Sequence, residues 1–232
     1  LYNYTFNGKH TLTVGADYLR DYLMSYQFTD NADHTMHTAD AFGQFDWNPT
    51  ERLNVIAGLR FDYFSDSNVR HLSPHLGMMY KIGSCSLRGS YSQGFRSPTL
   101  KEMYMVFNMA NMMMIYGNPD LKSETSHNFS VSAEYTKNRY NFSVTGYYNL
   151  VHNRINTVYS EDPKGQIYTN TDKMDIAGID ANISAKYPCG LGYRLSYTYI
   201  HEFMRDGQKK FTDTRPHTAT VRIDWGKTLN KV

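Results

Sequence analysis

Cysteines, long apolar runs and net charge are all scarce in this 232-residue sequence. The two cysteines, Cys85 and Cys189, fall in expected short turns, so they could pair only if those turns lie close in space. No stretch approaches the ~18 consecutive apolar residues that a transmembrane helix requires, and the mean hydropathy is −0.58. A formal net charge of +2 gives no field strong enough to favour a nucleic-acid partner. These absences exclude a helical membrane protein and argue against binding to DNA or RNA.

Catalytic patterns are missing as well. The sequence contains no Ser-His-Asp or Cys-His arrangement, no ligand spacing typical of zinc and no phosphate-binding loop. We therefore expect that the chain is not an enzyme and holds no resident cofactor.

The sequence does contain repeated alternation of apolar and polar residues with a period of two. In residues 53–63 every odd-numbered residue is apolar or aromatic, while Asn54, Arg60 and Asp62 stand between them. Successive side chains of a strand point to opposite faces of a sheet, so this segment predicts a strand with one apolar and one polar face. The same pattern recurs in residues 128–135, 177–187 and 217–225.

The connections between these segments alternate between short and long. The short connections are residues 7–9, 48–52, 82–84, 137–139 and 188–192. The long, polar connections are residues 27–38, 65–71, 97–125, 156–171 and 205–215. A Greek-key sandwich would mix its connection lengths, whereas an up-and-down barrel places all short turns on one rim and all long loops on the other.

Strand length and aromatic content favour a membrane barrel over a soluble one. The segments run past ~10 residues, which is the length that a tilted transmembrane strand needs. Aromatic residues make up 15% of the chain, with 20 tyrosines, and many fall at predicted strand ends, where they suit the lipid headgroup level. We predict an all-β, antiparallel, up-and-down transmembrane β-barrel of about ten to eleven strands. Its apolar face would contact membrane lipid, with short periplasmic turns and long extracellular loops.

Several motifs in the predicted loops and strand starts resemble those of a known family. Residues 94–104 read Gly-Phe-Arg-Ser-Pro-Thr-Leu-Lys-Glu-Met-Tyr, and residues 116–126 read Tyr-Gly-Asn-Pro-Asp-Leu-Lys-Ser-Glu-Thr-Ser. Residues 168–170 (Tyr-Thr-Asn) precede residues 177–180 (Ala-Gly-Ile-Asp), and residues 215–219 read Arg-Pro-His-Thr-Ala. Together they resemble the Phe-Arg-Ala-Pro, Gly-Asn-Pro-Asp-Leu-Lys-Pro-Glu, Tyr-x-Asn and Pro-x-His patterns of TonB-dependent outer-membrane receptors.

The resemblance implies a location, a larger protein and a function. It implies that residues 1–232 are a fragment of a 22-stranded barrel in the outer membrane of a Gram-negative bacterium, with the plug domain and last strands absent. It further implies import of a scarce nutrient, an iron complex such as a ferric siderophore, haem or a corrinoid such as cobalamin, powered by the TonB energy-coupling protein through the plug. The paired motifs are typical of haem receptors, but the loop between them has no histidine where those receptors commonly place one.

The loop between the paired motifs is the predicted ligand-binding region. It holds six of the chain's twelve methionines. Their thioethers could form a deformable apolar surface for a bulky ligand, could simply pack the loop, or could coordinate a soft metal or haem iron. The ligand-binding candidates are Arg96, Met103, Tyr104, Met105, Met109, Met112, Met113, Met114, Tyr116, Asn118 and Asp120.

Two further sets of residues are candidates for other roles. Polar residues on the face opposite lipid would line the lumen and contact a plug. They are Arg60, Asp62, Arg88, Glu134, Asp180 and Arg222. Two histidine pairs in or beside outer loops, His34 with His37 and His71 with His75, are weak candidates for metal binding, since loop histidines are more often solvated.

A second hypothesis keeps the barrel and changes its role. In that interpretation the barrel is a scaffold that binds a surface lipoprotein or another partner, and transport takes place elsewhere. A barrel enzyme ranks third, because it would need a nucleophile or an acid-base cluster at one rim.

Overall fold

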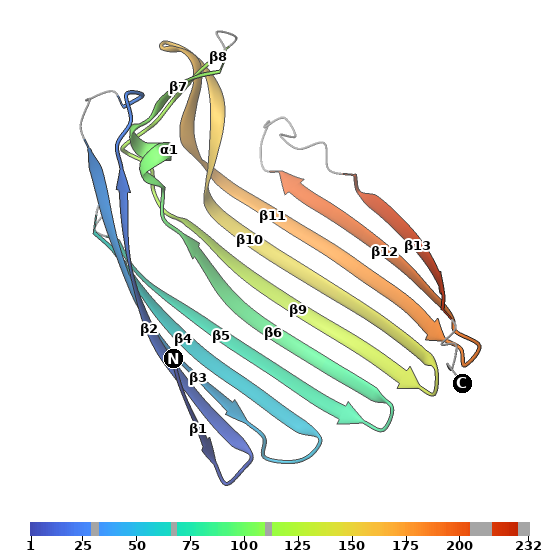
Figure 1. Cartoon of the computed structure of the whole chain (residues 1–232). Coiled ribbons are helices and arrows are strands. Elements are labelled where there is room, and N and C mark those ends of the chain that lie inside the picture. The colour runs from blue at the N-terminus through green and yellow to red at the C-terminus, as the bar shows by residue number, and fades with distance from the viewer. Residues whose placement is uncertain (29–32, 66–68, 110–112, 205–214, 227–232) are drawn as a thin grey trace, which may run out of the picture.

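The computed structural model describes residues 1–28, 33–65, 69–109, 113–204 and 215–226, which form one curved sheet, antiparallel along its main path, with an insertion that contains a short helix (Figure 1). Among the described residues, no helix has the length and apolar character needed to span a membrane. The elements are β1 (Tyr2–Phe6), β2 (His10–Leu23), β3 (His34–Trp47), β4 (Leu53–Phe64), β5 (Val69–Ile82), β6 (Cys85–Arg96), α1 (Leu100–Tyr104), β7 (Val106–Met109), β8 (Met113–Tyr116), β9 (Glu124–Lys137), β10 (Tyr140–Glu161), β11 (Lys164–Lys186), β12 (Leu191–Met204) and β13 (His217–Trp225).

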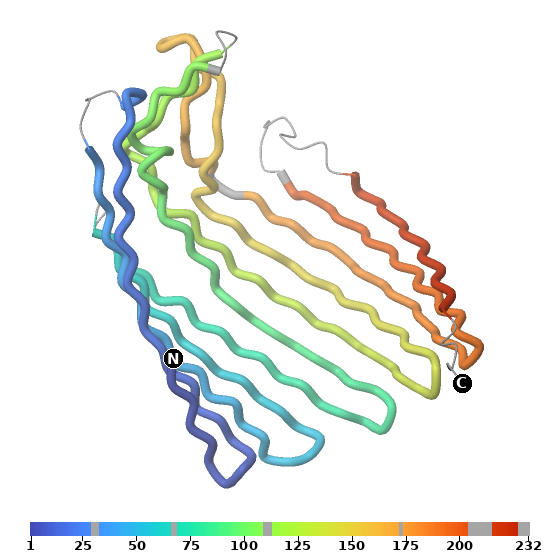
Figure 2. Tube along the Cα trace, viewed as in Figure 1, coloured from blue at the N-terminus to red at the C-terminus, as the bar shows by residue number. Residues whose placement is uncertain are grey.

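The main path of the sheet confirms the predicted up-and-down barrel topology. Its strand order is β1-β2-β3-β4-β5-β6-β9-β10-β11-β12-β13, so every strand pairs with the next one along the chain except where α1, β7 and β8 are inserted. All the pairs along this path are antiparallel. Figure 2 shows the trace as an open, twisted trough that amounts to part of a barrel wall.

The register assigns each side chain to one of two faces, because directly opposed residues share a face. We call these the apolar face and the polar face. The apolar face carries large exposed side chains from β2 to β13. Examples are Val14, Leu59, Phe61, Leu76, Leu87, Val131, Val144, Ile179, Leu195 and Val221, all more than a third exposed. A continuous exposed apolar surface of this extent marks contact with another phase or partner, here the lipid predicted for this face.

The short turns all lie on one rim, as the connection pattern predicts (Figure 1). The first of them shows the chemistry: Asn7 and Gly8 have φ values of 49° and 63°, and the Lys9 N–H donates to the Phe6 carbonyl at 3.0 Å. Two successive residues with positive φ give the turn type that matches strand twist, and Asn-Gly is the preferred pair for it. Cys85 and Cys189 also belong to this rim, and both are free thiols.

The opposite rim differs from the prediction in two ways. Residues 156–171 are not a loop: β10 and β11 continue as paired strands to Glu161 and Lys164, well beyond their neighbours. Strands β3 and β5 also start earlier than expected, so His34, His37 and His71 lie in strands. The prediction failed here because apolar alternation fades where neither face of a strand meets lipid, and the polar composition then resembles that of a loop.

Candidate functional site

We call the insertion between β6 and β9, residues 97–123, the strap; its described residues, 97–109 and 113–123, fold over the long-connection rim. It starts with a helical turn whose capping is complete. The Thr99 side chain accepts the Glu102 N–H, and the Glu102 carboxylate accepts the Thr99 N–H at 2.9 Å. Reciprocal capping of this kind satisfies backbone donors that a helix start otherwise leaves unpaired. It lets a helix as short as α1 hold one orientation.

One side of the strap packs on β2 and β3. Leu100 and Met103 are 4% and 3% exposed and form a small core with Met36, which lies on the polar face of β3. The Val106 N–H donates to the Gln27 carbonyl at 2.7 Å. The strap therefore reaches the far wall of the trough across its polar face.

Aromatic stacking adds to this contact. The rings of His34 and Tyr104 are stacked with their centroids 3.9 Å apart, and Phe28 meets the edge of His34 at 4.8 Å. Phe28, which is 3% exposed, also forms a β-bridge with Met105. Stacked and edge-to-face rings contribute about 0.5–1.5 kcal/mol each beyond their burial.

The other side of the strap binds the extended β10–β11 hairpin. Strands β7 and β8 pair antiparallel with each other, and β8 pairs parallel with β11 through Ile115 and Tyr116. The Asn118 side chain donates to the Tyr168 carbonyl at 3.0 Å. The strap is thus anchored on both walls of the trough.

Asn170 provides the densest link between strap and hairpin. Its side-chain oxygen accepts the Lys122 N–H at 2.7 Å, and its amide nitrogen donates to the carbonyls of Lys122 and Asn153 at 2.8 and 2.7 Å. Lys122 and Asn170 are 48 residues apart in the chain, so the motifs at 116–126 and 168–170 meet through one amide.

Arg96 clamps the two ends of the strap together. Its guanidinium donates to Glu102 at 2.9 Å and lies 3.5 Å from the Glu124 carboxylate, which also accepts the Ile155 N–H at 3.1 Å. Ser97 and Pro98 next to it are buried. The Phe-Arg-Ser-Pro motif therefore fixes where the strap leaves β6 and returns to β9.

Gly117 is required by packing at the centre of the strap. A Cβ at this position would lie 2.7 Å from the Met103 carbonyl oxygen and 2.9 Å from the Met105 nitrogen, both backbone atoms. Backbone cannot move aside as a flexible side chain can, so only glycine fits without displacing α1.

The predicted methionines fall into three groups. Met103 is buried and supports the strap, which favours the packing interpretation for that residue. Met105, Met113 and Met114 are half-buried, as is Tyr116. Met112 and the side chain of Met109 lie outside the described residues.

The other ligand candidates hold the strap in place or lie at its surface. Arg96 and Asn118 are engaged in the contacts above, and Tyr104 stacks on His34. Asp120 is exposed, and its N–H donates to the Asn118 side chain at 3.0 Å.

The histidine pairs are not arranged for shared metal binding. His34 and His37 fall on opposite faces of β3, because they are an odd number of residues apart on a strand. His71 and His75 share the polar face, but four residues of strand separate them by about 13 Å. In the described part of the chain, no group of three or more His, Cys, Asp or Glu residues could hold a metal ion.

The six predicted lumen residues all lie on the polar face, and each has a polar partner there. Arg60 bonds Asp62 at 2.9 Å and Asp40 at 3.1 Å, and Asp62 is only 5% exposed. The other contacts are Arg88 with Glu134 at 2.7 Å, Asp180 with Thr198 at 2.6 Å, and Arg222 with Asp224 at 2.9 Å. Their contact with a plug stays a prediction.

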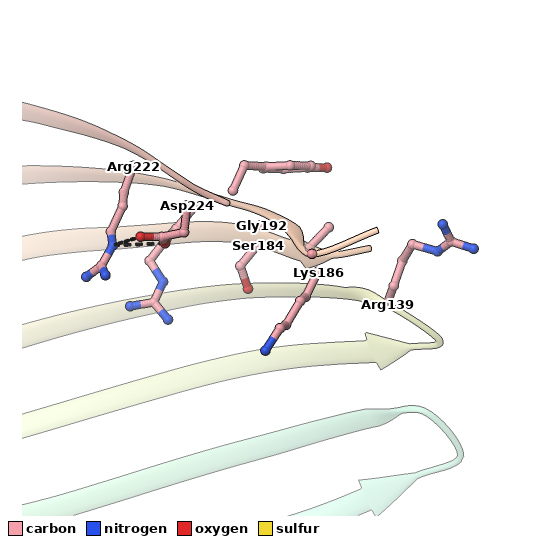
Figure 3. Close-up of a pocket in the computed structure, with 10 residues that line it drawn as sticks. Arg139, Ser184, Lys186, Gly192, Arg222 and Asp224 are labelled. Carbon is pink, nitrogen blue, oxygen red and sulfur yellow. Dashed lines mark hydrogen bonds and ion pairs between the residues drawn. The ribbon is translucent and has the colours of Figure 1, made fainter. Parts of the chain in front are cut away.

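A recess of about 380 Å³ lies on the polar face beside the short-turn rim of β11, β12 and β13. Its charged lining consists of Arg139, Lys186, Arg194, Arg222 and Asp224. Figure 3 shows Arg222 bound to Asp224, with Lys186 and Arg139 nearer the turn. Four cations against one carboxylate make this recess suited to anionic groups.

Sequence reasoning missed several residues that build the strap. Glu102, Glu124 and Asn170 were not among the candidates, although all three carry its ion pairs and hydrogen bonds. The Thr-x-x-Glu spacing of the capping box was a readable signal for Glu102. For Glu124 and Asn170 the contacts are long-range and have no local signature.

Comparison with known proteins supports the fold and its family. Residues 1–231 match the family model described as TonB dependent receptor-like, beta-barrel. An iron-regulated outer membrane virulence protein of Vibrio cholerae serotype O1 is 25% identical over 244 residues, covering 95% of this chain and 37% of that protein. The vitamin B12 transporter BtuB of Photobacterium profundum is 31% identical over 130 residues, covering 54% of this chain and 20% of the transporter.

Solved structures show the same architecture. The siderophore receptor PirA from Pseudomonas aeruginosa superposes with a TM-score of 0.79 at 19% identity, covering 96% of this chain and 41% of that receptor. The chain therefore spans less than half the length of the relatives that it matches.

Proposed function

The chain belongs to the TonB-dependent receptor β-barrel family and lies in the outer membrane of a Gram-negative bacterium, and on that premise we propose that the protein imports a scarce nutrient across this membrane. The nutrient classes we propose are ferric siderophores, haem and cobalamin. The energy would come from TonB acting on a plug that the polar face of the barrel surrounds.

The strap is the observation that supports a transport role at this rim. It crosses the polar face from β3 to β11 and so lies over the mouth of the trough. A ligand approaching from the long-connection side meets the strap before it reaches the lumen. A fixed polypeptide at this place can position a ligand above a plug without blocking the whole opening.

Within the strap, we propose that Met105, Met113, Met114 and Tyr116 form the ligand-facing surface. Their half-burial leaves part of each side chain available, unlike that of Met103. Unbranched methionines adapt to a bulky ligand, and a tyrosine adds an aromatic surface with a polar tip. This proposal adopts the deformable apolar surface over metal coordination, because unbranched side chains of this kind adapt to the bulky ligand classes named above.

The test uses purified full-length protein and three probes: haemin, cobalamin and ferric enterobactin. A shifted Soret band, retained corrinoid absorbance or retained catecholate absorbance identifies the class bound. If none of the three binds at micromolar concentration, the proposed nutrient classes are wrong.

The role of the strap methionines is tested on the probe that binds. We expect the double variant Met113→Leu, Met114→Leu to weaken binding at least fivefold, because leucine is stiffer and less polarizable. Met78→Leu is the matched control, since Met78 lies on the apolar face of β5 and is 54% exposed, far from the strap. Equal affinities for the double variant and the control would remove these methionines from the ligand surface.

The binding scaffold for a surface lipoprotein remains the second candidate. It predicts a protein that captures its partner but supports no TonB-dependent uptake of any probe. Uptake assays in cells with and without TonB separate the two functions.

A further inference from the structure

Histidines are distributed unevenly on the apolar face. The register places six of the chain's nine histidines on this face: His10, His37, His127, His152, His201 and His217. His10 lies beside the short-turn rim, where its Nδ1 accepts the Asn48 N–H at 3.0 Å. The other five lie in the half of the sheet away from the short turns, as the bounds of their strands show.

Three of these histidines bond to tyrosine hydroxyls in the same way. The hydroxyl-to-Nδ1 distances are 2.6 Å for Tyr18 and His37, 2.9 Å for Tyr91 and His127, and 2.7 Å for Tyr197 and His217. Each pair joins two neighbouring strands: β2 with β3, β6 with β9, and β12 with β13.

The geometry of the three pairs is also the same. Each tyrosine directly opposes a residue of the neighbouring strand: Tyr18 opposes Ala39, Tyr91 opposes Phe129 and Tyr197 opposes Ala219. In all three cases the bonded histidine lies on that neighbouring strand, two residues farther from the short turns than the opposed residue. Diagonal neighbours on one face of a sheet are within reach of long and aromatic side chains. The same motif therefore recurs at three places across the described wall.

Each pair offers at least one hydrogen-bond donor to its surroundings, whatever the tautomer. A neutral tyrosine and a neutral histidine carry one polar hydrogen each, and their mutual bond uses only one of the two. The remaining N–H or O–H needs an acceptor, because an unpaired donor in hydrocarbon costs several kcal/mol. The pairs are therefore suited to the headgroup region and unsuited to the acyl chains.

The height of the pairs agrees with that location. The strands that carry the bonded histidines have an aromatic residue on the same face beside the short turns: Trp47, Tyr135 and Trp225. Eight to ten residues separate each aromatic from its histidine, with apolar or small residues on this face between them. At about 3.3 Å per residue and a tilt near 45°, this is about 19–23 Å along the membrane normal, close to the ~25 Å apolar band of outer-membrane barrels.

A positive side chain accompanies one of the pairs, because Arg20 directly opposes His37. The Arg70 guanidinium lies on the same face of β5, a strand that carries no pair, 6.0 Å from the Tyr63 ring centroid. Both arginines are exposed. The carboxylate of Asp175 on this face accepts the Tyr148 hydroxyl at 3.1 Å. Arginine beside neutral N–H and O–H donors is a combination that recognises phosphate oxygens.

We propose that this far-side band, formed by the three Tyr–His pairs with Arg20 and Arg70, binds the phosphate groups of phosphorylated lipid headgroups in the leaflet next to the long connections. Phosphate oxygens accept the donor that each pair leaves over, and Arg20 and Arg70 add positive charge on the β2–β5 side of the band. The band then fixes the height of the barrel in the membrane on this side, where the strap lies.

The test measures lipid binding to the full-length protein in neutral detergent by native mass spectrometry. The probes are diphosphorylated lipid A, the same lipid after dephosphorylation, and inorganic phosphate as a competitor. The triple variant His37→Phe, His127→Phe, His217→Phe keeps the rings and removes their nitrogens, and His10→Phe is the matched control from the other rim.

We expect the triple variant to bind diphosphorylated lipid at least tenfold more weakly, with His10→Phe equal to the parent protein. The parent protein should discriminate against the dephosphorylated lipid, and inorganic phosphate at equal concentration should not displace the bound lipid. Equal binding by the triple variant, no discrimination between the two lipids, or full displacement by inorganic phosphate would each overturn the proposal. If the triple variant does not fold, the single variant His217→Phe on β13 is measured under the same criteria, with at least a twofold loss expected.

Discussion

We predict that the hydrogen bonds of the Asn170 side chain hold the strap against the β10–β11 hairpin, and we call this set of contacts the latch. The Asn170 side chain makes three hydrogen bonds of 2.7–2.8 Å, all to backbone groups, and two of them join it to Lys122 at the end of the strap. Asn170→Ala removes all three bonds. Asn170→Asp keeps an acceptor for the Lys122 N–H but turns a carboxylate toward two carbonyls.

The magnitude follows from these contacts. Each hydrogen bond contributes about 0.5–1.5 kcal/mol net, and the side chain is only half-buried, so we take about 2–3 kcal/mol for Asn170→Ala. Since about 1.4 kcal/mol is a factor of ten, local opening of the strap should become roughly 30- to 140-fold more frequent. We expect Asn170→Asp to open the strap at least tenfold more often than the parent.

The measurement is hydrogen exchange by mass spectrometry on peptides covering residues 97–123 of the full-length protein. Exchange of these peptides should accelerate by the stated factor, while peptides from β4 and β5 stay unchanged. Asn182→Ala is the control, because Asn182 lies on the same strand and bonds to no other described side chain. Unchanged exchange in the Asn170→Ala strap, or equal acceleration in the control, would refute the latch.

Two further variants test other parts of the chain. Gly117→Ala should push the α1 backbone at Met103 away from residue 117, at a cost of about 1–3 kcal/mol. We expect protease cleavage within the strap while the barrel itself stays folded, and an uncut strap would contradict the packing argument. Arg60→Met leaves the buried Asp62 carboxylate without its cation, and we expect it to lower the free energy of unfolding, measured with denaturant, by about 2 kcal/mol. Arg88→Met removes one partner of a more exposed ion pair and should lower the same quantity by less than ~1 kcal/mol. Equal losses in the two variants would contradict the role of burial.

The barrel wall was predictable from the sequence because a sheet with one apolar and one polar face follows a simple rule. Every second residue between Leu53 and Tyr63 lies on the apolar face, so the alternation in the sequence records the strand directly. The turns were equally readable, since Asn7-Gly8 needs backbone angles that few other pairs adopt easily.

The rim above the membrane was less predictable, because its order comes from contacts between distant segments. The β10–β11 extension is stabilised by pairing with β8 and by the links from Asn118 and Asn170, none of which has a local pattern. The polar composition of this extension therefore led to the prediction of a loop at residues 156–171. The histidines were misplaced for the same reason, since His34 and His37 belong to a strand that rises beyond the apolar band.

The structural positions of the residues in the paired motifs bear on whether those motifs indicate a particular ligand. Arg96 holds the strap by its two carboxylate partners, Asn118 holds it to Tyr168, and Gly117 admits the α1 backbone. These residues explain why the two motifs occur together: they close one loop. These structural contacts engage the motif residues, so the presence of the motif pair indicates how the strap is built and does not indicate which ligand the protein binds.

We therefore propose that ligand identity depends on the segment between the motifs. The segment from Met105 to Tyr116 is held at both ends by the motif residues and carries the half-exposed methionines. Exchanging residues 105–116 for those of a relative should transfer ligand preference and leave the strap anchored. Exchanging the motif residues instead should release the strap and weaken the binding of every probe. An unanchored loop loses conformational entropy each time a ligand orders it, and this loss lowers the affinity. Transfer of preference by the motifs alone would show that they contact ligand after all.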